Sequence, residues 1–274
     1  MPELPEVETI ARGLDKRIAG DVIESVWLGT KPEPLKSSAE QITIALESKK
    51  ISRVHRMGKH IVFDLAPANG TSSQHSPQGH WIVHLGMTGS LRVCPPGVKA
   101  QKHTHAVLQL ASGRELRFID PRRFGRLSVI EKFEAPGSEP LQISFEDFVA
   151  LFRRRKTPIK SALLNQKLLS GVGNIYADEA LFRAKIRPRR RAASLTTDEL
   201  RRLHSSLKKV LQEAIRAGGS SISDYVDANG DEGFFQLKHR VYGREGKPCL
   251  KCKTPIKRIV IAGRSSHYCP RCQR

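Results

Sequence analysis

The chain has 274 residues, of which 39% are hydrophobic and 27% are charged, a composition typical of a globular protein with one large or two ordinary domains. Its sequence contains no apolar stretch of about 18 residues that could cross a membrane as a helix. The first residues are acidic and interrupted by proline, whereas a secretory signal would be basic and then apolar. We therefore expect a cytoplasmic protein without membrane association.

The formal net charge of +20 is concentrated in the second half of the chain. Residues 1–150 carry 19 Lys and Arg against 17 Asp and Glu, a net charge of +2, while residues 151–274 carry 28 against 10, a net charge of +18. A field of this size attracts polyanions, and binding to phosphates releases condensed counterions. Nucleic acid is therefore the favoured partner, with a solvated basic surface or an anionic membrane as the alternatives.

The first residues predict a helix that begins almost at the amino terminus. Pro5 suits a first helical turn, and the acidic residues Glu6 and Glu8 complement the helix dipole. A helix in this position would hold the amino terminus in place. The apolar positions that follow have the spacing of one helical face: Val7, Ile10, Leu14 and Ile18.

Residues 22–130 have the pattern of a sheet. Short apolar or alternating runs, separated by Gly, Pro and Asn, occur at 60–65, 81–85, 106–110, 116–119 and 127–130. They predict a β-sandwich or a barrel. Residues 66–79 are rich in Ser, Gly, Pro and Asn and are interpreted as an excursion from the sheet.

The pattern becomes helical after a region that we interpret as a linker, which contains Pro136, Pro140 and a basic run at 153–156. Thr196 and Glu199 have the spacing of a capping box, and Gly218 and Gly219 end the predicted helix. The buried stripe of this helix is expected to be Leu200, Leu203, Leu207, Val210, Leu211 and Ala214.

Residues 171–176 predict a tight turn between two helical stretches. The two glycines permit the turn, and Asn174 is placed to cap the helix that follows. A helix amino terminus of this kind can bind a phosphate, although an ordinary helix cap would have the same pattern.

The last four of five cysteines form the pattern C-x2-C-x16-C-x2-C. Two close pairs separated by a loop can supply four thiolates to one tetrahedral Zn²⁺, as in a zinc ribbon. Two disulfides are the alternative, which a reducing compartment disfavours. Four cysteine ligands leave no open position, so the ion is expected to be structural, and Cys94 has no partner. The predicted ligands are Cys249, Cys252, Cys269 and Cys272.

Seven segments together resemble the formamidopyrimidine-DNA glycosylase family, and they cover essentially the whole chain in order. They are Pro2-Glu3-Leu4-Pro5-Glu6-Val7-Glu8-Thr9, Arg56-Met57-Gly58-Lys59, the segments 84–92, 120–125, 171–176 and 241–244, and the cysteine ribbon 249–272.

The resemblance implies an α+β fold. An amino-terminal two-layer β-sandwich with flanking helices would be followed by a helix-two-turn-helix bundle and a zinc-ribbon β-hairpin. The expected divisions are a catalytic domain at 1–135, a linker region at 136–155, a helix-two-turn-helix domain with a lesion-closing loop at 156–240, and the ribbon at 241–274. The resemblance places the lesion-closing loop at residues 220–233.

The resemblance also implies covalent catalysis by Pro2, once Met1 has been removed. An α-amino group has a lower pKa than lysine, so more of it is neutral near pH 7. Attack on C1′ of the deoxyribose gives an iminium that permits β,δ-elimination. Glu3 would deliver a proton to the sugar ring oxygen, and Glu6 looks like a supporting carboxylate. As isolated residues, Pro2 would indicate only an efficiently processed terminus, and Glu6 a first-turn acid.

Further roles follow from the resemblance alone. Met87 and Phe124 would fill the gap left by a flipped nucleotide while Arg122 contacts the opposite cytosine; alone, they would be read as two core residues and a solvated charge. Lys59 and Arg264, counted with the catalytic residues, would contact phosphates. The remaining DNA contacts would come from Asn174, Lys160 and Tyr242.

The sequence thus predicts a bifunctional DNA glycosylase and lyase of base excision repair that removes oxidised purines, among them 8-oxoguanine and formamidopyrimidines. Its partner would be double-stranded DNA carrying an oxidised base, and a monomer would suffice. Two alternatives stay open: an endonuclease VIII-like enzyme for oxidised pyrimidines, and a non-catalytic nucleic-acid-binding protein with a zinc ribbon. Leu4 and the segment 120–124 favour the purine enzyme, and Pro2 and Glu3 argue against the non-catalytic protein.

Overall fold

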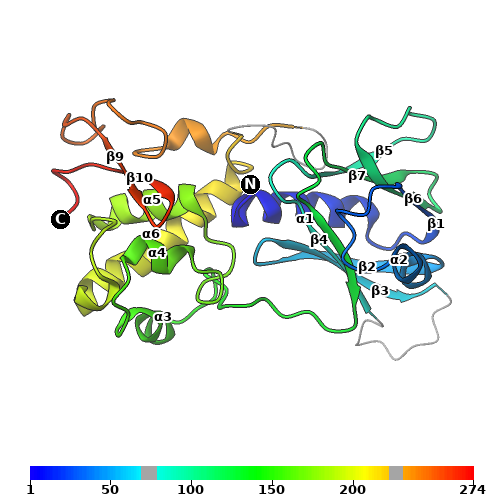
Figure 1. Ribbon diagram of the computed structural model, residues 1–274, viewed down its shortest axis with the longest axis horizontal. Coiled ribbons are helices and arrows are strands. Elements are labelled where there is room, and N and C mark those ends of the chain that lie inside the picture. Colours follow the sequence, from blue (N-terminus) through cyan, green and yellow to red (C-terminus); the bar gives the residue numbers. More distant parts are fainter. Residues whose placement is uncertain (69–78, 222–230) are drawn as a thin grey trace. The chain divides into compact units, whose positions relative to one another are not determined.

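A computed structural model describes residues 1–68, 79–221 and 231–274 (Figure 1). The chain divides into two compact units. The first comprises Met1–Glu134 and Gly218–Gly233, and the second comprises Ala135–Ala217 and Phe234–Arg274. Within the described residues, no helix has both the length and the apolar character needed to span a membrane.

The first unit is a β-sandwich of two antiparallel four-stranded sheets. One sheet has the strand order β1-β6-β7-β5 and the other the order β2-β3-β4-β8. Apolar side chains from both sheets and from two helices form one buried core. The elements are α1 (Leu4–Ile18), β1 (Ile23–Leu28), α2 (Ala39–Leu46), β2 (Lys49–Met57), β3 (His60–Pro67), β4 (Gly79–His84), β5 (Ser90–Cys94), β6 (Thr104–Leu110), β7 (Glu115–Ile119) and β8 (Arg126–Ile130).

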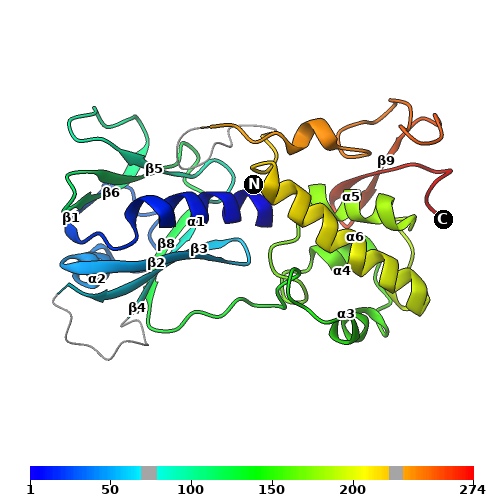
Figure 2. The ribbon, with the colours of Figure 1, turned by 180° about the vertical axis from the view of Figure 1, so that it is seen from behind.

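Helix α1 confirms the prediction for the start of the chain. It begins at Leu4, and Pro5 lies in its first turn, where the missing amide hydrogen costs nothing. The four residues of the predicted apolar face are at most 1% exposed. The helix packs against β2, β3 and β5 and therefore contacts both sheets. Figures 1 and 2, which view the ribbon from opposite sides, both show α1 beside these strands.

Helix α2 departs from the prediction of sheet over residues 22–130. The Ser38 side chain accepts the amide of Gln41, and the Gln41 side chain accepts the amide of Ser38, so the helix has a complete capping box. Its buried face consists of Ile42 and Leu46. Two buried residues in eight are too few to produce a helical period in the sequence, so the helix was missed.

The second unit consists of helices and a two-stranded hairpin. Helix α5 packs against α4, α6 and β10, and α3 packs against α6. Helix α6 is capped by Thr196, and its six buried residues are the six that the sequence predicts. The elements are α3 (Phe145–Phe152), α4 (Ile159–Leu164), α5 (Asn174–Ala184), η1 (Ala192–Ser194), α6 (Thr197–Arg216), η2 (Phe235–Lys238), β9 (Lys257–Ile261) and β10 (Arg264–Tyr268).

The stretch 136–155 contains α3, which the Ser144 side chain caps by accepting the amide of Asp147. Phe148 and Phe152 of this helix are fully buried. Most of the excursion expected at 66–79 lies outside the described residues.

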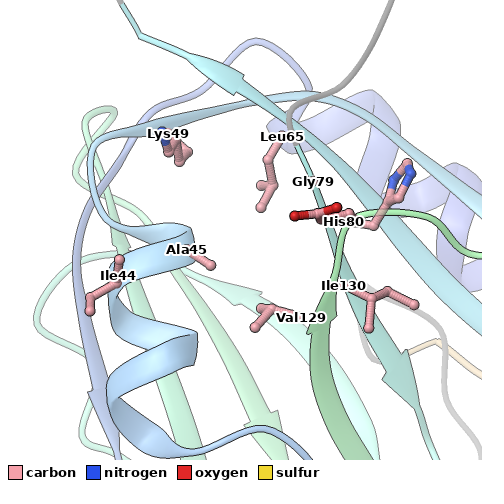
Figure 3. Close-up of a pocket in the computed structure, with 9 residues that line it drawn as sticks. Ile44, Ala45, Lys49, Leu65, Gly79, His80, Val129 and Ile130 are labelled. Carbon is pink, nitrogen blue, oxygen red and sulfur yellow. The ribbon is translucent and has the colours of Figure 1, made fainter.

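A pocket of about 310 Å³ lies in the first unit beside α2 (Figure 3). Its described lining is largely apolar and comes from α2 and the strands β2, β3, β4 and β8. None of the site residues predicted from the sequence belongs to this lining, so the pocket gives no support to the predicted chemistry.

Candidate active site and zinc centre

The amino terminus lies among charged groups of the first unit. Burial lowers the pKa of the Met1 amino group, Glu3 and Glu6 raise it, and Lys59 and Arg122 lower it, with a net result below the usual value. Glu3 and Glu6 are 4% and 2% exposed. An amine in these surroundings is neutral, and hence nucleophilic, more often than an ordinary α-amino group. Pro2, the next residue, is half-buried.

Glu6 connects the start of α1 to a segment far along the chain. One carboxylate oxygen accepts the amide of Glu3 and the other accepts the amide of Ser220, each at 2.8 Å. Gly219 has a φ of +83°, and a Cβ at this position would lie 2.9 Å from the Glu6 side chain. The close approach therefore requires glycine. Residues 222–230 of the expected lesion-closing loop lie outside the described residues.

Lys59 lies in the two-residue turn between β2 and β3, where Gly58 has a φ of +59°. The turn is tied to α1 through Arg56, whose guanidinium donates to Glu8 at 2.7 Å and to the carbonyl of Gly58 at 3.1 Å. Burial alone would raise the pKa of the Glu8 carboxyl, but Arg56, with Arg12, brings it below its usual value. The motif at 56–59 thus fixes the Lys59 backbone beside the first helix.

Met87 and Phe124 are exposed, at 44% and 51%, which overturns the reading of these two residues as core. The guanidinium of Arg122 lies 4.6 Å from the centre of the Phe124 ring, a cation–π contact. Large apolar side chains on a surface are suited to contact a partner.

Asn174 does not cap α5 as the sequence indicated. Gly173 is the N-cap, in an extended conformation, and Asn174 is the first residue of the helix. Glycine is tolerated at an N-cap, and here it leaves the Asn174 side chain available for another partner. Its amide nitrogen donates to the hydroxyl of Ser265 at 3.3 Å.

Arg264 is exposed at the start of β10, beside Ser265. The turn between β9 and β10 has two residues, Ala262 and Gly263, with φ values of 46° and 73°. Positive φ at both positions is typical of the two-residue turns that match the twist of a hairpin. This turn places Arg264 at the tip of the ribbon.

Lys160 is fully buried, and its partners were not foreseen from the sequence. Its ammonium lies 2.7 Å from a carboxylate oxygen of Asp178 and donates to the backbone carbonyl of Ser265 at 2.6 Å. The other Asp178 oxygen accepts the amide of His267 at 2.8 Å. Lys160 therefore joins α4 to α5 and to β10. An acid among the small and apolar residues of α5 was the signal that could have revealed it.

Tyr242 is half-buried, and its ring meets the rings of His239 and His267 edge to face, at 5.7 and 5.1 Å. The fully buried Glu179 accepts the three successive backbone amides of residues 240–242 at 2.9 Å. Burial raises the pKa of Glu179 despite these amides and Arg183, which lower it. The carboxylate fixes the backbone that carries Tyr242.

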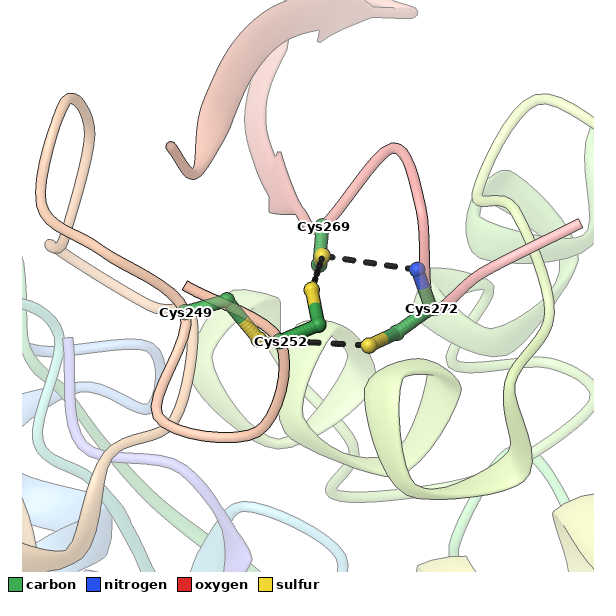
Figure 4. Close-up of side chains that lie close together, drawn as sticks. All are labelled: Cys249, Cys252, Cys269 and Cys272. Carbon is green, nitrogen blue, oxygen red and sulfur yellow. Dashed lines mark hydrogen bonds between the residues drawn. The ribbon is translucent and has the colours of Figure 1, made fainter. Parts of the chain in front are cut away.

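The four ribbon cysteines lie together in the second unit (Figure 4). All four Sγ atoms are within 4.8 Å of one another, with 3.9 Å between Cys249 and Cys272 and 3.4 Å between Cys252 and Cys269. A tetrahedral Zn²⁺ with bonds of about 2.3 Å requires sulfur atoms about 3.8 Å apart, so the cysteines fit one ion. All five cysteines are free of disulfides, and Cys94, the fifth, ends β5 half-buried.

Family models match the chain in three successive parts. The formamidopyrimidine-DNA glycosylase N-terminal domain matches residues 1–127, and the H2TH domain of the same glycosylase matches residues 136–226. The zinc finger found in FPG and IleRS matches residues 246–274. The last match and the cysteine geometry agree on one structural zinc ion.

Relatives and solved structures match along the full chain. The formamidopyrimidine-DNA glycosylase of Solibacter usitatus is 49% identical, and that of Desulforamulus reducens 43% identical, each over 100% of this chain and at least 99% of its own. A Lactococcus lactis FPG mutant, in complex with a Fapy-dG containing DNA, has a TM-score of 0.89 at 35% identity and 100% coverage of both chains. The MutM (FPG) protein of Thermus thermophilus has a TM-score of 0.85 at 42% identity, covering 99% of this chain and 98% of its own. This chain therefore belongs to the formamidopyrimidine-DNA glycosylase family.

Proposed function

We propose that this protein is a bifunctional DNA glycosylase and AP lyase that excises oxidised purines, such as 8-oxoguanine and formamidopyrimidines, from double-stranded DNA. The observation that carries the proposal is the amino terminus, where burial lowers the amine pKa and two carboxyl groups and Lys59 lie close by. Membership of the family supports the same activity, since the relatives carry the name of the purine enzyme.

The proposed nucleophile is the secondary amine of Pro2 after removal of Met1. Its lone pair forms a bond to C1′ of the sugar, the bond to the base breaks, and the base leaves with the electron pair. The N–H proton that the attacking amine loses is taken up by the departing base. Glu3 donates a proton to the ring oxygen as the C1′–O4′ bond opens, which leaves an iminium on Pro2. Loss of a C2′ proton then expels the 3′ phosphate, and a second elimination expels the 5′ phosphate.

Glu6 acts in this proposal as a positioning residue. Its two hydrogen bonds hold the amide of Glu3 and the amide of Ser220 at fixed places beside the amine. The same carboxylate suits the positive end of α1, so the first-turn role and the positioning role are compatible.

The target base must leave the stack before the amine can reach its sugar, which costs a few kcal/mol. The exposed side chains of Met87 and Phe124 fill the gap, and Arg122 hydrogen-bonds the opposite cytosine. The cation–π contact between Arg122 and Phe124 supports a joint action of these two residues.

Phosphates beside the flipped nucleotide are bound by Lys59, Asn174 and Arg264. We assign Lys160 a positioning role, because its buried ammonium holds Asp178 and the Ser265 carbonyl next to Arg264. Tyr242 contacts DNA from the segment that Glu179 fixes. The zinc ion, bound by the four cysteines, holds the ribbon folded and takes no part in the reaction.

All of these groups belong to one chain, so the protein acts as a monomer, on the DNA of the nucleoid. Duplexes with 8-oxoguanine opposite cytosine and with thymine glycol opposite adenine test the substrate class. We expect single-turnover excision to be faster on the first duplex. Faster excision of thymine glycol would contradict the assignment and favour the pyrimidine enzyme.

A further inference from the structure

Asp120 is a fully buried acid that the reaction outlined above does not use. It directly follows β7, and its side chain accepts hydrogen bonds from the residues that come next in the chain. One carboxylate oxygen accepts the hydroxyl of Thr88 and, at 3.3 Å, the amide of Arg122. The other accepts the amide of Gly125 at 2.7 Å. The carboxylate thus has three donors in two separate loops.

Each donor belongs to, or is adjacent in sequence to, a residue that we propose either fills the gap left by the flipped base or contacts the opposite cytosine. Thr88 follows Met87, Arg122 donates its own amide, and Gly125 follows Phe124. The Thr88 hydroxyl also accepts the Arg122 amide at 3.3 Å, so the two loops share one small hydrogen-bond network.

The backbones of the same two loops are in contact. Gly86 has a φ of +65°, and a Cβ at this position would lie 2.5 Å from the carbonyl carbon of Phe124. A Cβ at Gly125 would lie 2.5 Å from the Phe118 ring and 3.1 Å from the Asp120 carboxylate. Gly86 is therefore required for the approach of the two loops, and Gly125 for the packing of its loop on Phe118 and Asp120. The packing leaves the loops little freedom to move independently.

We propose that Asp120 and Thr88 form a positioning pair that holds Met87, Arg122 and Phe124 in one fixed arrangement. Met87 and Phe124 then enter the gap left by the flipped base at the same time as Arg122 contacts the opposite base. This inference rests on the proposed function and deepens it. Asp120 has only hydroxyl and amide donors among the contacts of the described residues, and no ion pair. Such a carboxylate fixes the directions of its donors, because each of its oxygens accepts hydrogen bonds along its lone pairs.

The experiment compares Thr88→Val with Thr88→Ser in the full chain. Valine keeps the shape of threonine and removes the hydroxyl, while serine keeps the hydroxyl. The readout is the ratio of the excision rates for 8-oxoguanine opposite cytosine and opposite adenine. We expect Thr88→Val and Asp120→Asn to reduce this ratio about tenfold, since small displacements of positioned groups have large effects on rate. Thr88→Ser should keep the wild-type ratio.

Two measurements separate this inference from its alternatives. Thermal unfolding shows whether a variant is folded. Asp64→Asn serves as a control in which a partly buried acid of the same unit loses the negative charge that contacts His55 and His80. Asp64→Asn should keep the wild-type ratio even if it unfolds more easily. A folded Thr88→Val protein with the wild-type ratio would overturn the inference.

Borohydride trapping on a preformed abasic site tests the proposed function separately, because it requires the amine and not the opposite base. We expect all of these variants to form the adduct. If the wild type forms no adduct, the proposed function fails. If the wild type forms the adduct but does not distinguish cytosine from adenine, the proposed function survives, while the role of Arg122 and this inference are overturned.

Discussion

The two units hold their site residues in different ways. In the first unit, the groups around the amine combine near and distant partners: Glu6 accepts the amide of Glu3, three residues away, and that of Ser220, 214 residues away, while Lys59 lies in a two-residue turn. In the second unit, the residues proposed to bind or support phosphate contacts depend on distant partners. Lys160 and Ser265 are 105 residues apart, and Asn174 and Ser265 are 91 residues apart.

The two units also differ in net charge, since most of the net charge of +20 lies beyond residue 150. In the proposed reaction the first unit supplies the chemistry, and the second supplies most of the attraction to phosphate. Changes to Glu3 and Glu6 in the first unit should slow excision and preserve binding. Changes in the second should weaken binding, and many of them should also reduce stability.

Removal of zinc should have the largest effect. Binding of a structural zinc ion contributes about 10–16 kcal/mol to the folding of small zinc modules, so the ribbon should unfold without it. We expect chelation, or Cys269→Ser, to weaken DNA binding at least about 100-fold, as the ribbon carries Arg264. Fluorescence anisotropy measures the affinity, and Cys94→Ser is the matched control. Unchanged affinity of the metal-free protein would contradict the role of the ribbon.

Glu3→Gln should separate chemistry from binding. The amide cannot deliver the proton to the sugar ring oxygen, and loss of a general acid costs about 10²–10⁴-fold in rate. We expect single-turnover excision to fall by this factor with little change in DNA affinity. The exposed Glu24→Gln provides a control for the loss of one negative charge. Equal excision by Glu3→Gln and the wild type would refute the assigned role.

Lys160→Met should show that the second unit depends on a buried ion pair. The change leaves the Asp178 carboxylate buried without its cation, which costs about 3 kcal/mol or more. Urea unfolding should reveal this loss, together with weaker DNA binding. Lys167→Met, at an exposed position of the same unit, should leave both nearly unchanged. Equal stability of the two variants would argue against the positioning role.

The smallest effect concerns Glu8 and Arg56, which tie the Lys59 turn to α1. The pKa of Glu8 is lowered in the folded protein, so its contribution to stability is present above the unfolded pKa of about 4.3 and is lost as the pH falls through the lower folded value. At pH 7, Glu8→Gln should cost about 1 kcal/mol, measured by urea unfolding. The difference from the wild type should shrink near pH 3; a constant difference would contradict this origin.

Much of the fold could be predicted from local patterns. The zinc spacing, the Thr196 capping box and the apolar face of α1 each lie within one short segment, and each was confirmed. Strands β1, β2 and β5 lie within the region predicted as sheet but were not identified individually, and helix α2 was missed. In β1, β2 and α2 few residues are buried, so the apolar pattern is weak.

The predicted site residues came mainly from the family resemblance. The acids that position these residues could not be predicted. Asp120, Asp178 and Glu179 accept hydrogen bonds from residues that are distant in the sequence and that only the fold brings close. In the sequence, no local pattern identifies the partners of these three acids. For Asn174, the local pattern led to a wrong prediction. The pattern indicated a helix cap, but in the fold the side chain donates a hydrogen bond to Ser265.

The central claim is that the amine of Pro2 attacks the sugar of the damaged nucleotide. Borohydride reduction during reaction with an 8-oxoguanine duplex, followed by peptide mass spectrometry, tests it most directly. We expect a covalent adduct on an amino-terminal peptide that begins at Pro2. An adduct on Lys59 or another lysine, or an active protein that retains Met1, would contradict it.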